Sequence, residues 1–85
     1  MFTVTWTPSA EDDLAFIWIN ADSSQRGKIS RYAAEAIRNL RANADRIGES
    51  REKGVRILAE STLGMQFRVS VLDRLVTVFH VWPIQ

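Results

Sequence analysis

Three side chains in the second half of the sequence could together hold a phosphate and move a proton: Arg56, Arg68 and His80. A guanidinium binds a phosphate through two parallel hydrogen bonds and keeps its charge at any working pH. An imidazole titrates near neutral pH and can serve as a general acid or base. These residue types make a minimal catalytic set for phosphodiester cleavage, provided that the fold brings them to one surface.

Other chemistries find less support in the residues. The chain has one histidine and no cysteine, so we expect no metal site and no disulfide. Its four glycines are scattered and form no phosphate-binding loop. No serine-centred elbow motif is present. The sequence therefore predicts no cofactor.

Charge is unevenly distributed along the chain. The formal net charge is +1, yet residues 1–23 carry four acidic and no basic residues, whereas residues 24–85 carry eleven basic and six acidic residues. Nine of the eleven basic residues are arginine, which is compatible with a phosphate-bearing partner. A solvated, salt-bridged surface explains the same composition, and so small a net charge argues against an ordinary nucleic-acid-binding protein.

Hydrophobic periodicity predicts the elements that must position these residues. Alternation over residues 2–6 predicts a first strand. A threonine followed by a proline predicts the start of a helix over residues 8–21. A regular apolar stripe over residues 29–47, ended by a glycine, predicts a second helix. Because the connection between the two helices is short, we expect an antiparallel helical hairpin.

The second half of the chain is predicted to be β-structure. Residues 48–54 are polar and bracketed by glycines, which predicts a loop. Strands are predicted over residues 55–60, 65–71 and 75–82, joined by short turns into an antiparallel meander. The predicted fold is α+β in the order β-α-α-β-β-β, a single domain over residues 1–85. It has a small, mainly antiparallel four-stranded sheet covered on one face by the helical hairpin.

The last predicted strand is apolar on both sides, so we expect it to be central in the sheet. Alternation in the other strands turns one set of residues toward the face that the helices leave uncovered: Thr3, Thr5, Arg56, Leu58, Gln66, Arg68 and Ser70. Cross-strand neighbours lie within ~5 Å, so both arginines could contact one anion. The face of His80 stays open. In the alternative, structural interpretation, the arginines pair with Glu60 or Asp73 and His80 is a hydrogen-bonded sheet residue.

Several large apolar residues need a place in this arrangement. Phe16 and Ile19 lie off the main stripe of the first helix, so this helix either packs on two sides or leaves a patch for a partner; we favour the first. Trp6, Trp18 and Trp82 fall on apolar phases of their elements, which predicts core positions.

No apolar run approaches the ~20 residues that span a bilayer, and the first residues do not form a secretory leader. We therefore expect a cytoplasmic protein with no membrane partner.

The element order and two segments, VTWTPSAEDDLAFIW and LGMQFRVSVLDRLVTVFHVW, resemble the RelE/ParE superfamily of toxins from bacterial type II toxin–antitoxin systems, also called plasmid stabilisation proteins. The most specific part is the strand-turn-strand segment over residues 67–78. The resemblance implies a small sheet with two helices and a cognate antitoxin that wraps around the toxin. It also implies that Arg56 and Arg68 lie where the family places strand arginines.

The superfamily has two branches with different activities. One cleaves mRNA on the ribosome, and the other inhibits DNA gyrase without cutting RNA. Cleaving members usually continue past the last strand with basic residues and a tyrosine, whereas this sequence ends in residues 81–85, VWPIQ. The resemblance therefore favours a toxin of the gyrase-inhibiting type.

Two alternatives remain open at this point. The first is a ribosome-dependent mRNA endonuclease in which Arg56, Arg68 and His80 are the catalytic residues. The second is a non-toxic interaction module or a homodimer subunit, which the surplus apolar residues Phe16 and Ile19 indicate.

Overall fold

The α+β class predicted from the sequence is present in the computed structural model, which describes residues 1–60 and 62–84. The elements follow one another in the order β1 (Thr3–Trp6), α1 (Pro8–Ile19), α2 (Ser23–Asn43), β2 (Glu49–Glu52), β3 (Val55–Glu60), β4 (Leu63–Ser70) and β5 (Leu75–Pro83). No helix among the described residues is long and apolar enough to cross a membrane.

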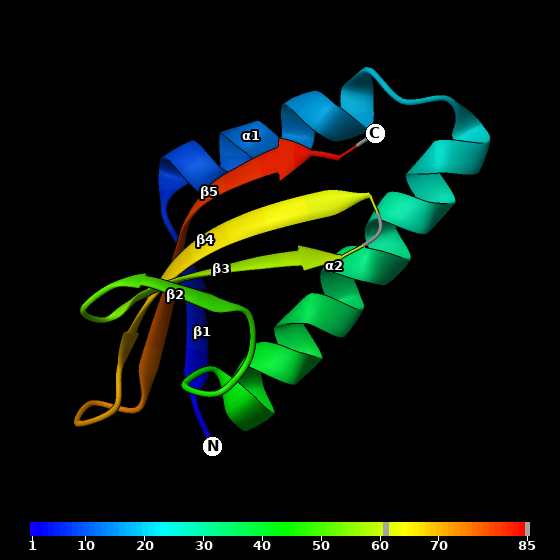
Figure 1. The fold of residues 1–85 in the computed structure, drawn as a ribbon. Helices are drawn as coiled ribbons and strands as arrows, with labels where there is room; N and C mark the ends of the chain where they lie inside the picture. Colours follow the sequence, from blue (N-terminus) through cyan, green and yellow to red (C-terminus); the bar gives the residue numbers. More distant parts are fainter. Residues whose placement is uncertain (61, 85) are drawn as a thin grey trace.

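The strands form one sheet in the order β1-β5-β4-β3-β2. β1 runs parallel to β5, and the other neighbouring strands are antiparallel. The apolar strand β5 lies between β1 and β4, which confirms that it is central (Figure 1). Its parallel pairing with β1 requires a long connection, which runs through both helices and then through β2, β3 and β4.

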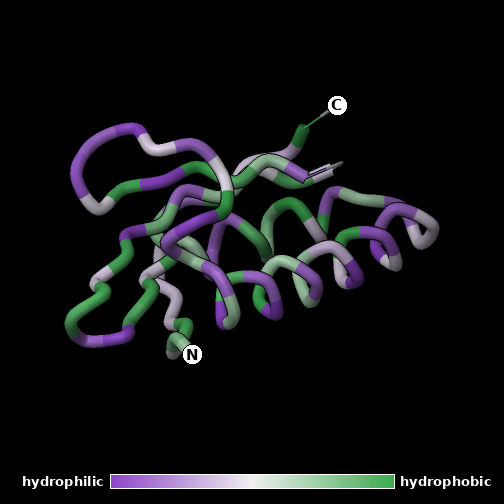
Figure 2. Tube along the Cα trace, turned by 60° about the horizontal axis from the view of Figure 1, so that its bottom comes forward, coloured by the Kyte–Doolittle hydropathy of each residue, from purple (hydrophilic) through white to green (hydrophobic). Residues whose placement is uncertain are grey.

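Residues 48–54, predicted to be a loop, contain the additional strand β2. It pairs antiparallel with β3, and all four of its residues are exposed. A strand exposed on both sides shows no apolar alternation, so periodicity could not reveal it. The hairpin is instead set by backbone pairing and by Gly48 and Gly54, whose φ angles are +74° and +80°. Figure 2 shows the hairpin as a largely hydrophilic edge.

α2 begins at Ser23, earlier than the predicted apolar stripe. Asp22 accepts a hydrogen bond from the Gln25 backbone at 2.8 Å, and the Gln25 side chain accepts one from the Asp22 backbone at 3.1 Å. This capping box starts the helix with a polar turn, so hydrogen bonding begins before the hydrophobic pattern does. Further along, the predicted stripe is confirmed by the buried residues Ile29, Ala33, Ala36 and Leu40.

α1 packs on the sheet with only one of its sides. Thr7 caps its start by accepting a hydrogen bond from the Ala10 backbone at 3.1 Å. Ala10 is fully buried, and Leu14 and Ile17 pack against the core. Phe16 and Ile19, on the other side, are 70% and 66% exposed. The prediction that this helix packs on two sides is therefore wrong.

Both helices lie on one face of the sheet, but they diverge from their short connection (Figure 1). An apolar groove of about 700 Å³ opens between them, lined among others by Leu14 and Trp18 of α1 and by Ala33 and Ile37 of α2. Trp18 is 42% exposed on this groove, so it is not the core residue that was predicted.

The hydrophobic core lies between the helices and the sheet. Trp6 is partly buried against it, in agreement with its prediction. Trp82 is not part of this cluster. The largest fully buried side chains of the cluster are Phe67, Leu40, Met65, Val76 and Val78.

Gly48 and Gly27 offer a matched pair of substitutions to alanine. A Cβ on Gly48 would collide with the backbone carbonyl of Ile57, and its φ is in the left-handed region. Because backbone cannot rotate away, we expect Gly48→Ala to lower the free energy of unfolding by about 2–4 kcal/mol. A Cβ on Gly27, inside α2, meets nothing within 4 Å, so Gly27→Ala should raise it by about 0.5–1 kcal/mol. Urea denaturation measures both free energies, and an unchanged stability of Gly48→Ala would contradict the expected collision with Ile57.

Candidate functional site

The register of the sheet decides which predicted site residues share a surface. Residues paired across neighbouring strands point to the same face. Arg56 pairs with Phe67, which pairs with Val78, and both partners are buried beneath the helices. Arg68 pairs with Thr77, which alternates with buried valines and so points to the open face. The two arginines therefore lie on opposite sides of the sheet.

The predicted common surface for the two guanidinium groups is wrong, and so is the outward position of Leu58. Leu58 is 8% exposed and belongs to the core. Because β3 is apolar on both sides, its alternation fits either orientation, and the pairing of Leu58 with Met65 decides between them. The other residues predicted on the open face do lie there: Thr3, Thr5, Gln66 and Ser70.

Arg56 holds the turn between α2 and β2. Its Nε donates to the carbonyl of Ile47 at 2.8 Å, and its Nη2 donates to the carbonyl of Gly48 at 3.1 Å. Carbonyl groups in a turn need hydrogen-bond partners from outside the helices and strands, and a guanidinium can donate to two of them at once. The geometry therefore indicates a structural role for Arg56.

Arg68 lies exposed on the open face. Its guanidinium carbon is 5.6 Å from the centre of the Phe79 ring, a cation–π distance. Neither Arg56 nor Arg68 forms the alternative ion pair with Glu60 or Asp73 in the described part of the chain. Arg68 is thus a cation that a ligand could reach.

His80 is held by a carboxylate from α1. Its Nδ1 lies 3.0 Å from Oδ2 of Asp13, and the same oxygen accepts the backbone N–H of Val81 at 3.1 Å. β1 pairs with β5 only as far as Val78, so beyond that point Asp13 supplies the hydrogen-bond partner for the strand edge. When Nδ1 carries the proton, it donates to Asp13, and Nε2 is left as an acceptor.

The two hydrogen bonds lower the pKa of Asp13 below its ordinary value of 3.8. The backbone N–H of Val81 is the larger cause and the side chain of His80 the second. Asp13 is therefore charged at neutral pH, and its negative charge orients the imidazole. A carboxylate–imidazole pair of this kind can accept a proton from a bound substrate.

His80 pairs with Gln66, so it lies on the open face, where Trp82 is its aromatic neighbour. The ring centres of His80 and Trp82 are 5.2 Å apart at 33°. The Trp82 indole covers Gly64, where any Cβ would collide with it, so Trp82 is a surface residue of the sheet and not the predicted core residue. We call Arg68, Phe79, His80 and Trp82 the open-face cluster. Its rings offer stacking surfaces and its guanidinium an anion contact.

Among residues 1–60 and 62–84, no group of three or more histidine, cysteine, aspartate or glutamate side chains could hold a metal ion.

No protein-family model and no curated protein matches this chain. A chain of the chromosomal ParDE toxin–antitoxin system from P. aeruginosa matches with a TM-score of 0.73 and 20% identity, over 100% of this chain and 98% of that one. The RelBE2 toxin–antitoxin complex from Mycobacterium tuberculosis gives 0.75 and 19%, over 98% and 91%. The isolated E. coli RelE toxin gives 0.64 and 14%, over 100% and 86%.

The chain has the RelE/ParE toxin fold. The resemblance found in the sequence is thereby confirmed at the level of the fold.

Within this RelE/ParE fold, Asp13 is the site residue that sequence reasoning missed. It is one of three consecutive acidic residues at the start of a helix, which the dipole of that helix explains without any further partner. Its contact with His80 joins residues 67 positions apart. Only the packing of α1 beside β5 creates that contact, and no local motif carries it.

The structural role of Arg56 can be tested against Arg68. Arg56→Met keeps the aliphatic stem but removes the two N–H groups that donate to the carbonyls of Ile47 and Gly48. We expect it to lower the free energy of unfolding by about 1–2 kcal/mol. Arg68→Met, on the open face, should change it by less than about 0.5 kcal/mol. Urea denaturation followed by tryptophan fluorescence compares them, and equal effects would refute the assignment.

The lowered pKa of Asp13 predicts how stability depends on pH. A carboxylate whose pKa is lower in the folded state stabilises the fold fully above its unfolded pKa, and this contribution is lost as the pH falls through the folded pKa. The wild type should therefore be more stable than Asp13→Asn at neutral pH, and the difference should shrink as the pH falls below about 4. Thermal unfolding across this range measures it; a constant difference would count against the prediction.

Proposed function

We propose that this chain is the toxin of a type II toxin–antitoxin module, that a cognate antitoxin protein neutralises it, and that it acts in the bacterial cytoplasm. The observation that carries the proposal is the agreement of the fold over its whole length with chains of the ParDE and RelBE2 systems, at TM-scores of 0.73 and 0.75. The matched chains are nearly as fully covered as this one, at 98% and 91%.

The proposed mode of action is inhibition by binding, with DNA gyrase as the first target to test. Arg56 supports this mode, because its guanidinium is engaged in the turn between α2 and β2, on the helix side of the sheet. A phosphodiester bound beside His80 would meet one arginine, Arg68, instead of the two that the cleavage hypothesis requires. The open-face cluster remains suited to contacts with a macromolecular surface through its rings and its cation.

The Asp13–His80 pair favours a second candidate, RNA cleavage. Nε2 of His80 has no hydrogen-bond partner among the described residues and can accept the proton of a ribose 2′-hydroxyl as that oxygen attacks the neighbouring phosphorus. The 5′-oxygen then leaves with a proton from solvent. Gln66 is the cross-strand partner of His80, and Arg68 lies two residues further along β4. Arg68 is therefore a diagonal neighbour of His80 and could hold the phosphate.

Controlled expression in a bacterial host tests both candidates. We expect expression of the chain to stop growth, and co-expression of the small reading frame next to its gene to restore growth and yield a stable complex. Under the binding mode, the 5′ ends of cellular transcripts stay unchanged, and His80→Ala still stops growth.

Under the second candidate, new discrete 5′ ends appear and are reduced by about 100-fold or more in His80→Ala. Unaffected growth, together with no capture of the neighbouring gene product, would refute the toxin proposal itself.

A further inference from the structure

α1 carries a second face that the fold leaves uncovered. Asp12, Ala15, Phe16 and Ile19 stand at helical spacings of three, four and seven residues, so they share one side of α1. We call this the second face of α1. All four are exposed, including the two large apolar side chains Phe16 and Ile19. Adjacent exposed side chains of this size mark an interaction surface.

We infer that this face binds the same face of a second copy of the chain, with the two α1 helices antiparallel about a two-fold axis. The sizes of its residues support a self-complementary contact. In an antiparallel pair centred between Ala15 and Phe16, each phenyl ring lies opposite Ala15 of the other copy. The small alanine leaves room for the ring, and the symmetry axis makes this contact twice.

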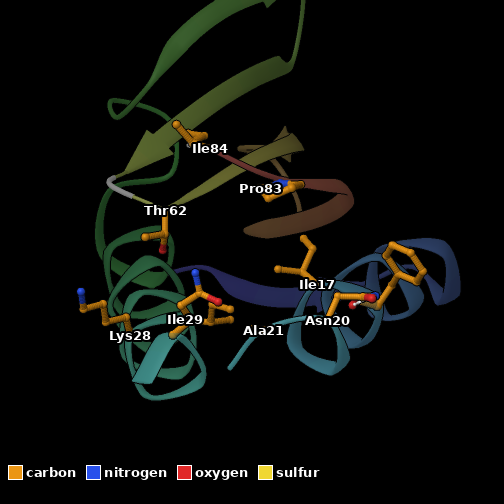
Figure 3. A pocket seen from close by; sticks show the side chains of 10 residues that line it. Ile17, Asn20, Ala21, Lys28, Ile29, Thr62, Pro83 and Ile84 are labelled. Carbon is orange, nitrogen blue, oxygen red and sulfur yellow. Dashed lines mark hydrogen bonds between the residues drawn. The ribbon is translucent and has the colours of Figure 1, made fainter. Parts of the chain in front are cut away.

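Apolar hollows border the same face. A pocket of about 440 Å³ lies beside Phe16, with Ile17, Ile29 and Ile84 among its walls (Figure 3). On the other side of α1, the groove between the helices is lined by Ala15, among other residues. In a two-fold contact, side chains that project from one copy must fit hollows on the same patch of the other copy. Phe16 and Ile19 project from the second face of α1, and the pocket and the groove border it.

Charge supports the antiparallel direction. Glu11 and Asp12 lie in the first half of α1, and its last turn has no basic residue of its own. Arg26, from the start of α2, donates to the last carbonyls of α1, and Lys28 lines the pocket at the same end. Antiparallel crossing brings the acidic half of each copy toward the basic end of the other and opposes the two helix dipoles.

The contact is small compared with a stable interface. Stable complexes bury roughly 800 Å² per partner, more than one helix face of four residues provides. We therefore expect a dissociation constant on the order of 10–100 µM. This inference does not depend on the toxin proposal, because a chain without effect on growth can still form the dimer.

Sedimentation equilibrium from about 1 µM to about 1 mM tests the association. The apparent mass should rise from 9.7 kDa toward twice that value. Phe16→Ser should raise the dissociation constant by about ten-fold or more. Leu72→Ser is the matched control, since Leu72 is 90% exposed in a turn far from α1 in the chain, and it should leave the dissociation constant unchanged.

Cysteine cross-linking tests the geometry, because the chain has no cysteine of its own. Ala15→Cys places a thiol next to the expected two-fold axis and should give a disulfide-linked dimer under mild oxidation. Ala34→Cys, at an exposed position of α2, should remain largely monomeric. The inference would be overturned if the chain stayed monomeric at the highest concentration or if the two cysteine variants formed equal amounts of cross-linked dimer. It would also be overturned if the second face of α1 were shielded from solvent only when an antitoxin is bound.

Discussion

The structure depends on how the two edges of β5 are paired. One edge pairs with β4, with one register shift at Phe79, and the other pairs with β1 as far as Val78. Beyond Val78 the carboxylate of Asp13 accepts the N–H of Val81, so a helix side chain completes what a short strand begins. The same oxygen then orients His80. Asp13 thus has two roles: it satisfies a backbone N–H at the edge of β5, and it orients the imidazole of His80 on the open face.

Several arginines make structural contacts within the fold, whereas from the sequence the high arginine content was linked to a phosphate-bearing partner. Arg26 donates to the carbonyls that end α1, and Arg56 donates to those that follow α2. Arg74 lies 4.3 Å from the centre of the Phe2 ring, beside the turn before β5. A guanidinium has several donors in one plane and therefore closes helix ends well. Arg68 is exposed on the open face, where a ligand can reach it.

α1 has one side packed against the core and one side exposed. Its buried side needs only Ala10, Leu14 and Ile17 to hold the sheet. Phe16 and Ile19 contribute little to that core, because they are mostly exposed. Burying them would require a further layer of structure over α1. The apolar surplus noted in the sequence is therefore a property of the surface.

Capping signals and hydrophobic periodicity are local properties of the chain, and they predicted the class of the fold, both helices, the central position of β5 and the strands β1, β3, β4 and β5. Packing and strand pairing were needed to show that β2 is a strand, that Arg56 points to the helix side and that Asp13 contacts His80. The face of a residue in a strand that is apolar on both sides depends on register, and register is set by backbone pairing with the neighbouring strand. The contact of Asp13 with His80 depends on where an entire helix packs, and no pattern in either segment encodes that position.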